Sequence, residues 1–186
     1  MRKRSVPERL SFCDHINEMT ECVMRKRIWL ASAAAGAMFL SGGASASAEP
    51  LQQKNMSLAL ANQLVSATLQ ACHADGRSAV VAVVDRGGRL VALQRDDNIG
   101  PHNTAAAQKK AFTSISTKTS SRELSAIARN NPESENLNTV DDLLLLGGGV
   151  PVNIDGEVIG AIGVAGAGGS AIDEGCALAA LETLNN

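Results

Sequence analysis

The chain has 186 residues, with 17 basic and 19 acidic side chains, and its length suits one folded domain. From residue 49 onward it carries 10 basic and 15 acidic residues, and Phe112 is the only aromatic residue there. That composition excludes a nucleic-acid binder that relies on a basic surface or on aromatic stacking.

The N-terminal part has the pattern of a secretory signal peptide. A basic start at Met24–Arg27 precedes an apolar run at Ile28–Leu40, and Ala46-Ser47-Ala48 matches a small-x-small cleavage site. We therefore expect residues 24–48 to be a signal peptide and the protein to be periplasmic or secreted. A retained membrane anchor is the alternative, but the apolar run is short for a spanning helix. After cleavage no stable membrane span is expected.

Two further boundaries follow from this leader. A signal peptide normally begins at the start of a chain, yet residues 1–23 are largely polar and precede Met24. We predict that translation begins at Met24 and that residues 1–23 are a mis-called N-terminal extension. Residues 49–56 are expected to form a flexible tail, and residues 57–186 to form the folded domain.

The first part of this domain predicts a helix followed by a hairpin. Apolar residues recur at helical spacing from Ser57 until Asp75-Gly76, which is typical of an amphipathic helix. Two runs rich in β-branched and apolar residues, 79–85 and 89–95, flank Arg86-Gly87-Gly88 and predict a β-hairpin. The second run alternates more clearly, so we expect it nearer the edge of a sheet.

Two helices are expected next. The first covers 105–116, with Asn103 or Thr104 as its cap. The second begins after a capping box at Ser120–Glu123, and this helix ends near Asn130.

A glycine-rich stretch, 142–169, predicts three antiparallel strands at 143–146, 150–154 and 158–165. Both faces of the last run are apolar or small, so this strand should be central, with glycines that allow close approach of another backbone. A final helix is expected over 174–184. The whole is an α+β domain with a five-stranded antiparallel sheet and helices on both faces.

Cys72 and Cys176 each lie on a predicted helix. An exported protein could pair them in an oxidising compartment. Two buried, unpaired cysteines fit the sequence equally well.

The candidate site centres on His102, which lies in the loop before a predicted helix, where backbone N–H groups favour an anion. Lys110, later on that helix, could reach back along its flexible stem. A histidine beside a cation could hold a carboxylate-bearing ligand or offer an imidazole to iron. The alternative is that His102 is an ordinary exposed residue and that Lys109-Lys110 is a solvated helix face.

Five segments of the chain resemble the GlcG/HbpS family, which includes haem-binding uptake proteins, glycolate-operon proteins and the C-terminal domain of certain cobalamin adenosyltransferases. The resemblance covers 58–184. The segments are VAVVDRGGRLVALQRDD, GPHNTAAAQKKAFTS, LLLLGGGVPV, DGEVIGAIGVAGAGG and DEGCALAALETL. At 166–168, Gly-Ala-Gly replaces the family's more usual Ser-Gly, so a hydroxyl contact to a ligand is not expected there.

The resemblance implies a profilin-like antiparallel sheet and a homo-oligomer, from a dimer to an octamer. It implies haem or a related tetrapyrrole as the ligand, with His102 as the metal ligand. Lys110, Thr113, Gly148 and Gly149 match family motifs and are expected at the ligand-binding site. Two alternatives remain: an enzyme that degrades haem or acts on a small metabolite, and a structural or signalling oligomer without a ligand.

Overall fold

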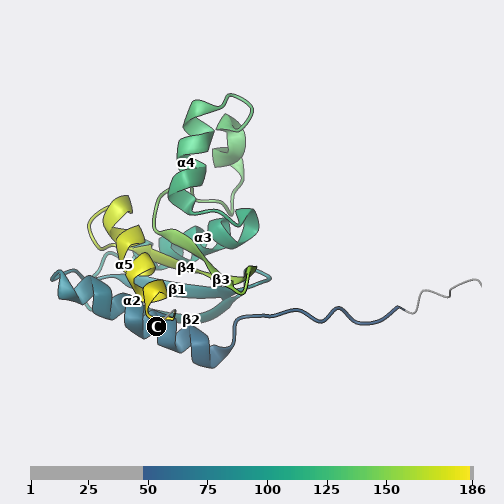
Figure 1. Ribbon diagram of the computed structural model, residues 1–186. Coiled ribbons are helices and arrows are strands. Elements are labelled where there is room, and N and C mark those ends of the chain that lie inside the picture. The colour runs from purple at the N-terminus through teal and green to yellow at the C-terminus, as the bar shows by residue number, and fades with distance from the viewer. Residues whose placement is uncertain (1–47, 185–186) are drawn as a thin grey trace, which may run out of the picture. The chain divides into compact units, whose positions relative to one another are not determined.

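The structure is a computed structural model that describes residues 48–184 (Figure 1). The predicted extension and nearly all of the predicted signal peptide lie outside the described residues. In chain order the elements are α2 (Leu58–Ala74), β1 (Val80–Asp85), β2 (Leu90–Arg95), α3 (His102–Thr117), α4 (Ser121–Asn130), the 3₁₀ helix η1 (Glu135–Thr139), β3 (Gly149–Ile154), β4 (Glu157–Ala165) and α5 (Ser170–Glu182). None of the helices in the described part is both long and apolar enough to cross a membrane.

The strands form one sheet in the order β2-β1-β4-β3, and every neighbouring pair is antiparallel. This confirms the predicted α+β class, although the described residues contain four strands rather than five. β4 is central and β2 is an edge strand, as the distribution of apolar residues predicted. Figure 1 shows α2 and α5 on one side of the sheet and α3 on the other.

The prediction of a strand at 143–146 is wrong, because this segment has no regular secondary structure. Its backbone groups bond to local carbonyls and to two side chains instead of a neighbouring strand. The Leu144 N–H donates to Thr113 Oγ1 at 2.8 Å, and the Leu146 carbonyl accepts from Ser121 Oγ at 2.8 Å. The predicted three-strand meander is therefore a two-strand hairpin, β3–β4, preceded by a side-chain-anchored loop.

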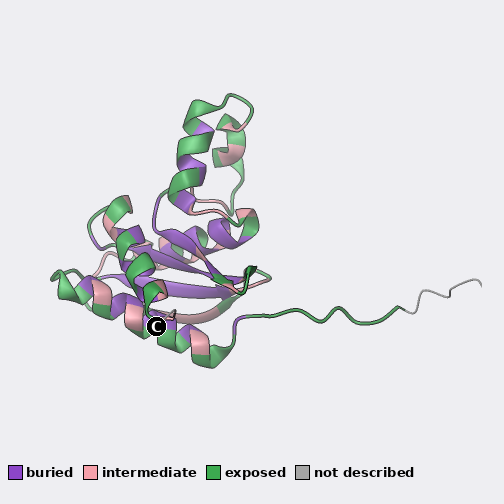
Figure 2. Ribbon diagram, in the orientation of Figure 1, coloured by how far each residue is buried: buried purple, intermediate pink, exposed green. Residues whose placement is uncertain are grey.

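The core has two layers because successive side chains of a strand point to opposite faces of the sheet. Val81 and Val83 of β1 pack with α2 and α5, while Val80, Ala82 and Val84 pack on the α3 side. Figure 2 shows the central strands almost continuously buried. This explains why these runs lack the apolar-polar alternation of a sheet with one wetted face.

Two glycines allow α3 to lie directly on the sheet. A Cβ atom added at Gly163 would meet the carbonyl oxygen of Ala107, and one at Gly149 would meet the carbonyl oxygen of Lys110. Any larger residue would push the helix away from the strands. The predicted close approach of another backbone to β4 is confirmed.

A disulfide joins Cys72 of α2 to Cys176 of α5, with their Cα atoms 5.3 Å apart. Both cysteines are buried in the core between the two helices and the sheet. The structure thereby decides between the two alternatives that the sequence left open.

The last residues of the expected tail contact the two hairpin turns. Lys54 forms a 2.6 Å ion pair with Asp155, and this hydrogen bond raises the pKa of Lys54 and lowers the pKa of Asp155. Asn55 Oδ1 accepts a 2.9 Å hydrogen bond from the Arg86 N–H, and the Met56 N–H donates to the Ile159 carbonyl at 3.2 Å. The chain is thus fixed to the domain a few residues before α2 begins.

Candidate ligand-binding groove

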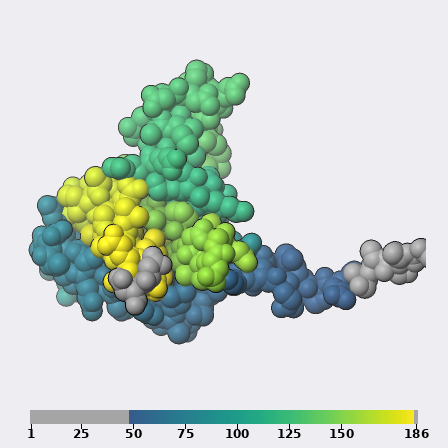
Figure 3. Space-filling view, in the orientation of Figure 1, coloured from purple at the N-terminus to yellow at the C-terminus, as the bar shows by residue number. Residues whose placement is uncertain are grey.

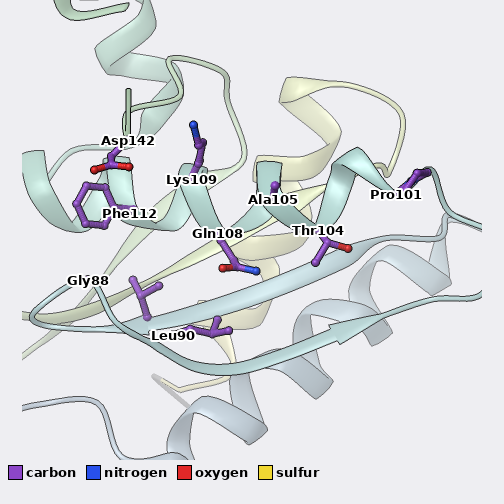
Figure 4. Close-up of a pocket in the computed structure, with 10 residues that line it drawn as sticks. Gly88, Leu90, Pro101, Thr104, Ala105, Gln108, Lys109, Phe112 and Asp142 are labelled. Atoms are coloured by element: carbon purple, nitrogen blue, oxygen red, sulfur yellow. The ribbon is translucent and has the colours of Figure 1, made fainter. Parts of the chain in front are cut away.

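An open groove of about 530 Å³ lies between the outward face of α3 and the β1–β2 hairpin (Figure 4). Its size is in the range of small-molecule sites, and its lining combines apolar with a few polar side chains. The lining residues are Val84, Gly88, Leu90, Pro101, Thr104, Ala105, Gln108, Lys109, Phe112 and Asp142.

The groove exists because α3 and the edge strand do not cover each other. Pro101, Thr104, Ala105, Gln108 and Phe112 recur at intervals of three or four residues and so share one helix face. The other face packs mainly against the three remaining strands. The edge strand is left partly open on this side, and Leu90 is 48% exposed.

His102 is the first residue of α3 and is exposed. It is not among the residues that line the groove, but it follows Pro101, which does, and one step of about 100° around the helix puts it just outside the lining face. Its ring lies close to Gly100, where an added Cβ would approach the imidazole. Within residues 48–184 this imidazole forms no hydrogen bond or ion pair, so its ring nitrogens are available to a ligand.

The start of α3 differs from the prediction. The helix begins three residues earlier than expected, at His102, and Pro101 is its N-cap without a side-chain hydrogen bond. Asn103, an expected cap, instead donates from its amide to the Gly100 carbonyl at 3.1 Å. Proline suits the beginning of a helix because its φ is already close to the helical value. His102 therefore belongs to the first turn rather than to the loop before it.

Lys110 has an internal partner. Its side chain is 2% exposed, and its Nζ donates to Asp173 Oδ2 at 2.7 Å and to the Val164 carbonyl at 2.9 Å. Asp173 Oδ1 accepts a further bond from the Ala167 N–H at 2.9 Å. Because Lys110 lies on the helix face opposite the groove, the structure does not bring it to the same place as His102.

Of the other three residues expected at the site, the two glycines lie against Lys110 and Thr113 bonds to neighbouring backbone groups. Thr113 Oγ1 donates to the Lys109 carbonyl at 2.7 Å and accepts from the loop at Leu144. A Cβ at Gly148 would come within 3.0 Å of Lys110 Nζ, and Gly149 touches the Lys110 carbonyl. Lys110, Gly148 and Gly149 thus lie together, Thr113 anchors the neighbouring loop, and His102 stands apart from them.

Sequence reasoning missed Gln108, Lys109 and Leu90 as groove residues. The spacing of Pro101, Thr104, Ala105 and Gln108 on one helix face was a usable signal. Nothing in the sequence identified the part of β2 that α3 leaves open.

A second cavity of about 740 Å³ lies between α4 and the first turn of α5. Arg122 and Arg129 line it together with Glu123 and Glu174, and Arg122 forms a 2.6 Å ion pair with Glu174. In Figure 3 the α4–η1 region is a separate projection of the surface. Its charges balance in number, so this cavity offers no net attraction to an ion.

Comparison with known proteins identifies the family of this domain. Residues 56–182 match the family described as "Haem degrading protein HbpS-like", and the chain belongs to that family. The expected resemblance to GlcG and HbpS is therefore confirmed.

Among individual relatives, the chain is 33% identical to Protein GlcG of Escherichia coli K12 over 109 residues, which cover 59% of this chain and 80% of GlcG. It is 35% identical to HbpS, with a TM-score of 0.69, covering 74% of this chain and 96% of HbpS. It is 26% identical to PduOC, solved as a haem complex, with a TM-score of 0.65, covering 70% of this chain and 96% of PduOC. The family thus includes a haem binder.

Proposed function

We propose that this protein binds haem or a related tetrapyrrole in the groove beside α3, with His102 as the axial ligand of the metal. The observation that carries the proposal is an unpaired, exposed imidazole on the residue next to Pro101, which lines one end of a partly apolar groove of suitable size. Membership of a family that includes a haem binder supports the choice of ligand.

The residues of the groove fit a flat macrocycle. Phe112 and Leu90 provide apolar surface, and the small side chain of Ala105 leaves room beside the helix (Figure 4). A neutral imidazole is a common iron ligand in haem proteins. Haem would supply a redox-active iron, while the protein's part is to hold the macrocycle and donate the imidazole nitrogen.

His102→Ala is expected to weaken haemin binding about tenfold or more and to change the position of the Soret band, because the iron loses its protein ligand. The measurement is an absorbance titration of residues 49–186 with haemin. No protein side chain absorbs in the region of the Soret band, so the protein contributes little background.

His73→Ala is the matched control, because His73 is the other histidine of residues 49–186 and already pairs with Asp96 at 2.9 Å. It should bind haemin as the wild type does. A spectrum that changes with His73→Ala and not with His102→Ala would reject the assignment of the ligand. Absence of any haemin binding to the wild type would reject the proposed function itself.

Haem degradation is a second candidate, because the family description names that activity. The same titration separates the two: a binding protein keeps its Soret absorbance after a reductant is added. An enzyme would lose this absorbance with time and release iron.

We also propose that the protein is exported and begins at Glu49. The leader pattern at 24–48 supports this, and so does the disulfide, because disulfides persist mainly in oxidising compartments. Mass spectrometry of the exported protein tests whether Glu49 is its N-terminal residue. Any peptide from residues 1–48 would contradict the proposal.

A further inference from the structure

Among the ten residues that line the groove, Lys109 is the only cation. We infer that Lys109, and not the neighbouring Lys110, binds the carboxylates of the ligand, so that the groove selects free-acid tetrapyrroles over esterified ones. This inference rests on the proposed function and names the residue that sets its specificity.

The helix puts Lys109 and His102 on the same flank. They are seven residues apart, which is about two turns and roughly 10 Å along the helix axis, with little rotation between them. Ala105, which lines the groove and is exposed, lies between them along the helix and carries a small side chain. A macrocycle whose metal is at His102 can therefore pass over Ala105 and present a propionate to Lys109.

The ammonium of Lys109 has capacity for such a contact. It donates one 2.6 Å hydrogen bond to the Asp141 carbonyl, and a lysine ammonium has three protons. Its side chain is exposed, in contrast to Lys110, whose ammonium is enclosed with Asp173. Of the two adjacent lysines, only Lys109 can meet a ligand without breaking a buried ion pair.

Asp142 gives the ligand an orientation. Its carboxylate lies next to Phe112, at the end of the groove opposite Pro101, and Lys109 projects from the preceding turn of α3 (Figure 4). A ligand carboxylate placed beside Asp142 would be repelled, and one placed beside Lys109 would be attracted. Because Lys109 Nζ bonds to the carbonyl of Asp141, directly before Asp142, the two charges are neighbours. The carboxylates should therefore lie on the side of Lys109 that faces His102, away from Asp142.

The test compares three probes: haemin, metal-free protoporphyrin IX and haemin dimethyl ester, which lacks free carboxylates. Lys109→Gln is expected to weaken binding of the two free acids about three- to tenfold, the range for a partly exposed charged contact, and to leave the ester unchanged. Lys109→Arg keeps the charge and should bind all three like the wild type. Lys118→Gln, at the exposed C-cap of α3, is the matched control and should change nothing.

His102→Ala provides the complementary pattern, because it removes the metal ligand and not the carboxylate partner. It should weaken the binding of haemin and of its dimethyl ester, and it should affect the binding of metal-free protoporphyrin much less. Equal losses of free acid and ester in Lys109→Gln, or no loss of either, would overturn the inference while leaving haem binding intact. If the wild type binds none of the three probes, the proposed function fails and the role of Lys109 fails with it.

Discussion

Replacing Lys110 by methionine is expected to lower the free energy of unfolding by about 3–5 kcal/mol, because the change leaves a buried carboxylate without its cation. Asp173 is 5% exposed, and Lys110 Nζ is its charged partner at 2.7 Å. Methionine preserves most of the side-chain volume, so the loss reports on charge rather than on a cavity. Urea denaturation followed by circular dichroism measures it.

Two variants make this prediction specific. Lys109→Met removes a cation from the next, exposed position and should change stability by less than about 1 kcal/mol. In the double variant Lys110→Met with Asp173→Asn, the buried charge is gone and the amide oxygen can still accept from the Ala167 N–H. The double variant should recover much of the loss. A double variant no more stable than Lys110→Met alone would show that the unpaired carboxylate is not the cause.

Removing the disulfide is expected to lower the free energy of unfolding by about 2–5 kcal/mol, since the bond closes a long loop and restricts the unfolded chain. The cysteines are 104 positions apart in sequence. Replacing both Cys72 and Cys176 by alanine avoids burying new hydroxyl groups between α2 and α5. Denaturation of this variant and of the wild type, each with and without a reductant, measures the difference.

A reductant should destabilise the wild type and leave the double alanine variant unchanged. Cys72 and Cys176 of the exported protein should also resist thiol reagents after denaturation without a reductant. Wild-type stability that does not respond to the reductant would contradict the stabilising role. Two reactive thiols in the exported protein would contradict the proposal that it folds in an oxidising compartment.

Much of the fold could be predicted because local patterns and tertiary packing agree there. Ser120 is the N-cap of α4, as predicted, with its hydroxyl accepting from the Glu123 N–H at 3.2 Å. The two hairpins have their turns at the expected glycines, and β4 is central, as its apolar residues on both faces indicated.

Other features depend on contacts between segments far apart in sequence. The leucines at 143–146 have the composition of a strand. The hydroxyl groups of Thr113 and Ser121, however, bond to the backbone of Leu144 and Leu146 in place of a neighbouring strand. The buried ion pair of Lys110 could not be predicted either, because its partner Asp173 is 63 positions away in sequence. The groove likewise required knowing which strand α3 leaves partly uncovered.

The measurement that tests the central claim most directly is haemin binding after each cavity is filled in turn. Ala105→Phe puts a large side chain into the groove beside α3, and Ala126→Phe puts the same side chain into the second cavity beside α4. Both alanines are exposed and helical, so the substitutions are matched. The account predicts that Ala105→Phe abolishes saturable haemin binding and that Ala126→Phe leaves it at the wild-type level. Undiminished binding in Ala105→Phe would contradict the assignment of the groove as the haem site.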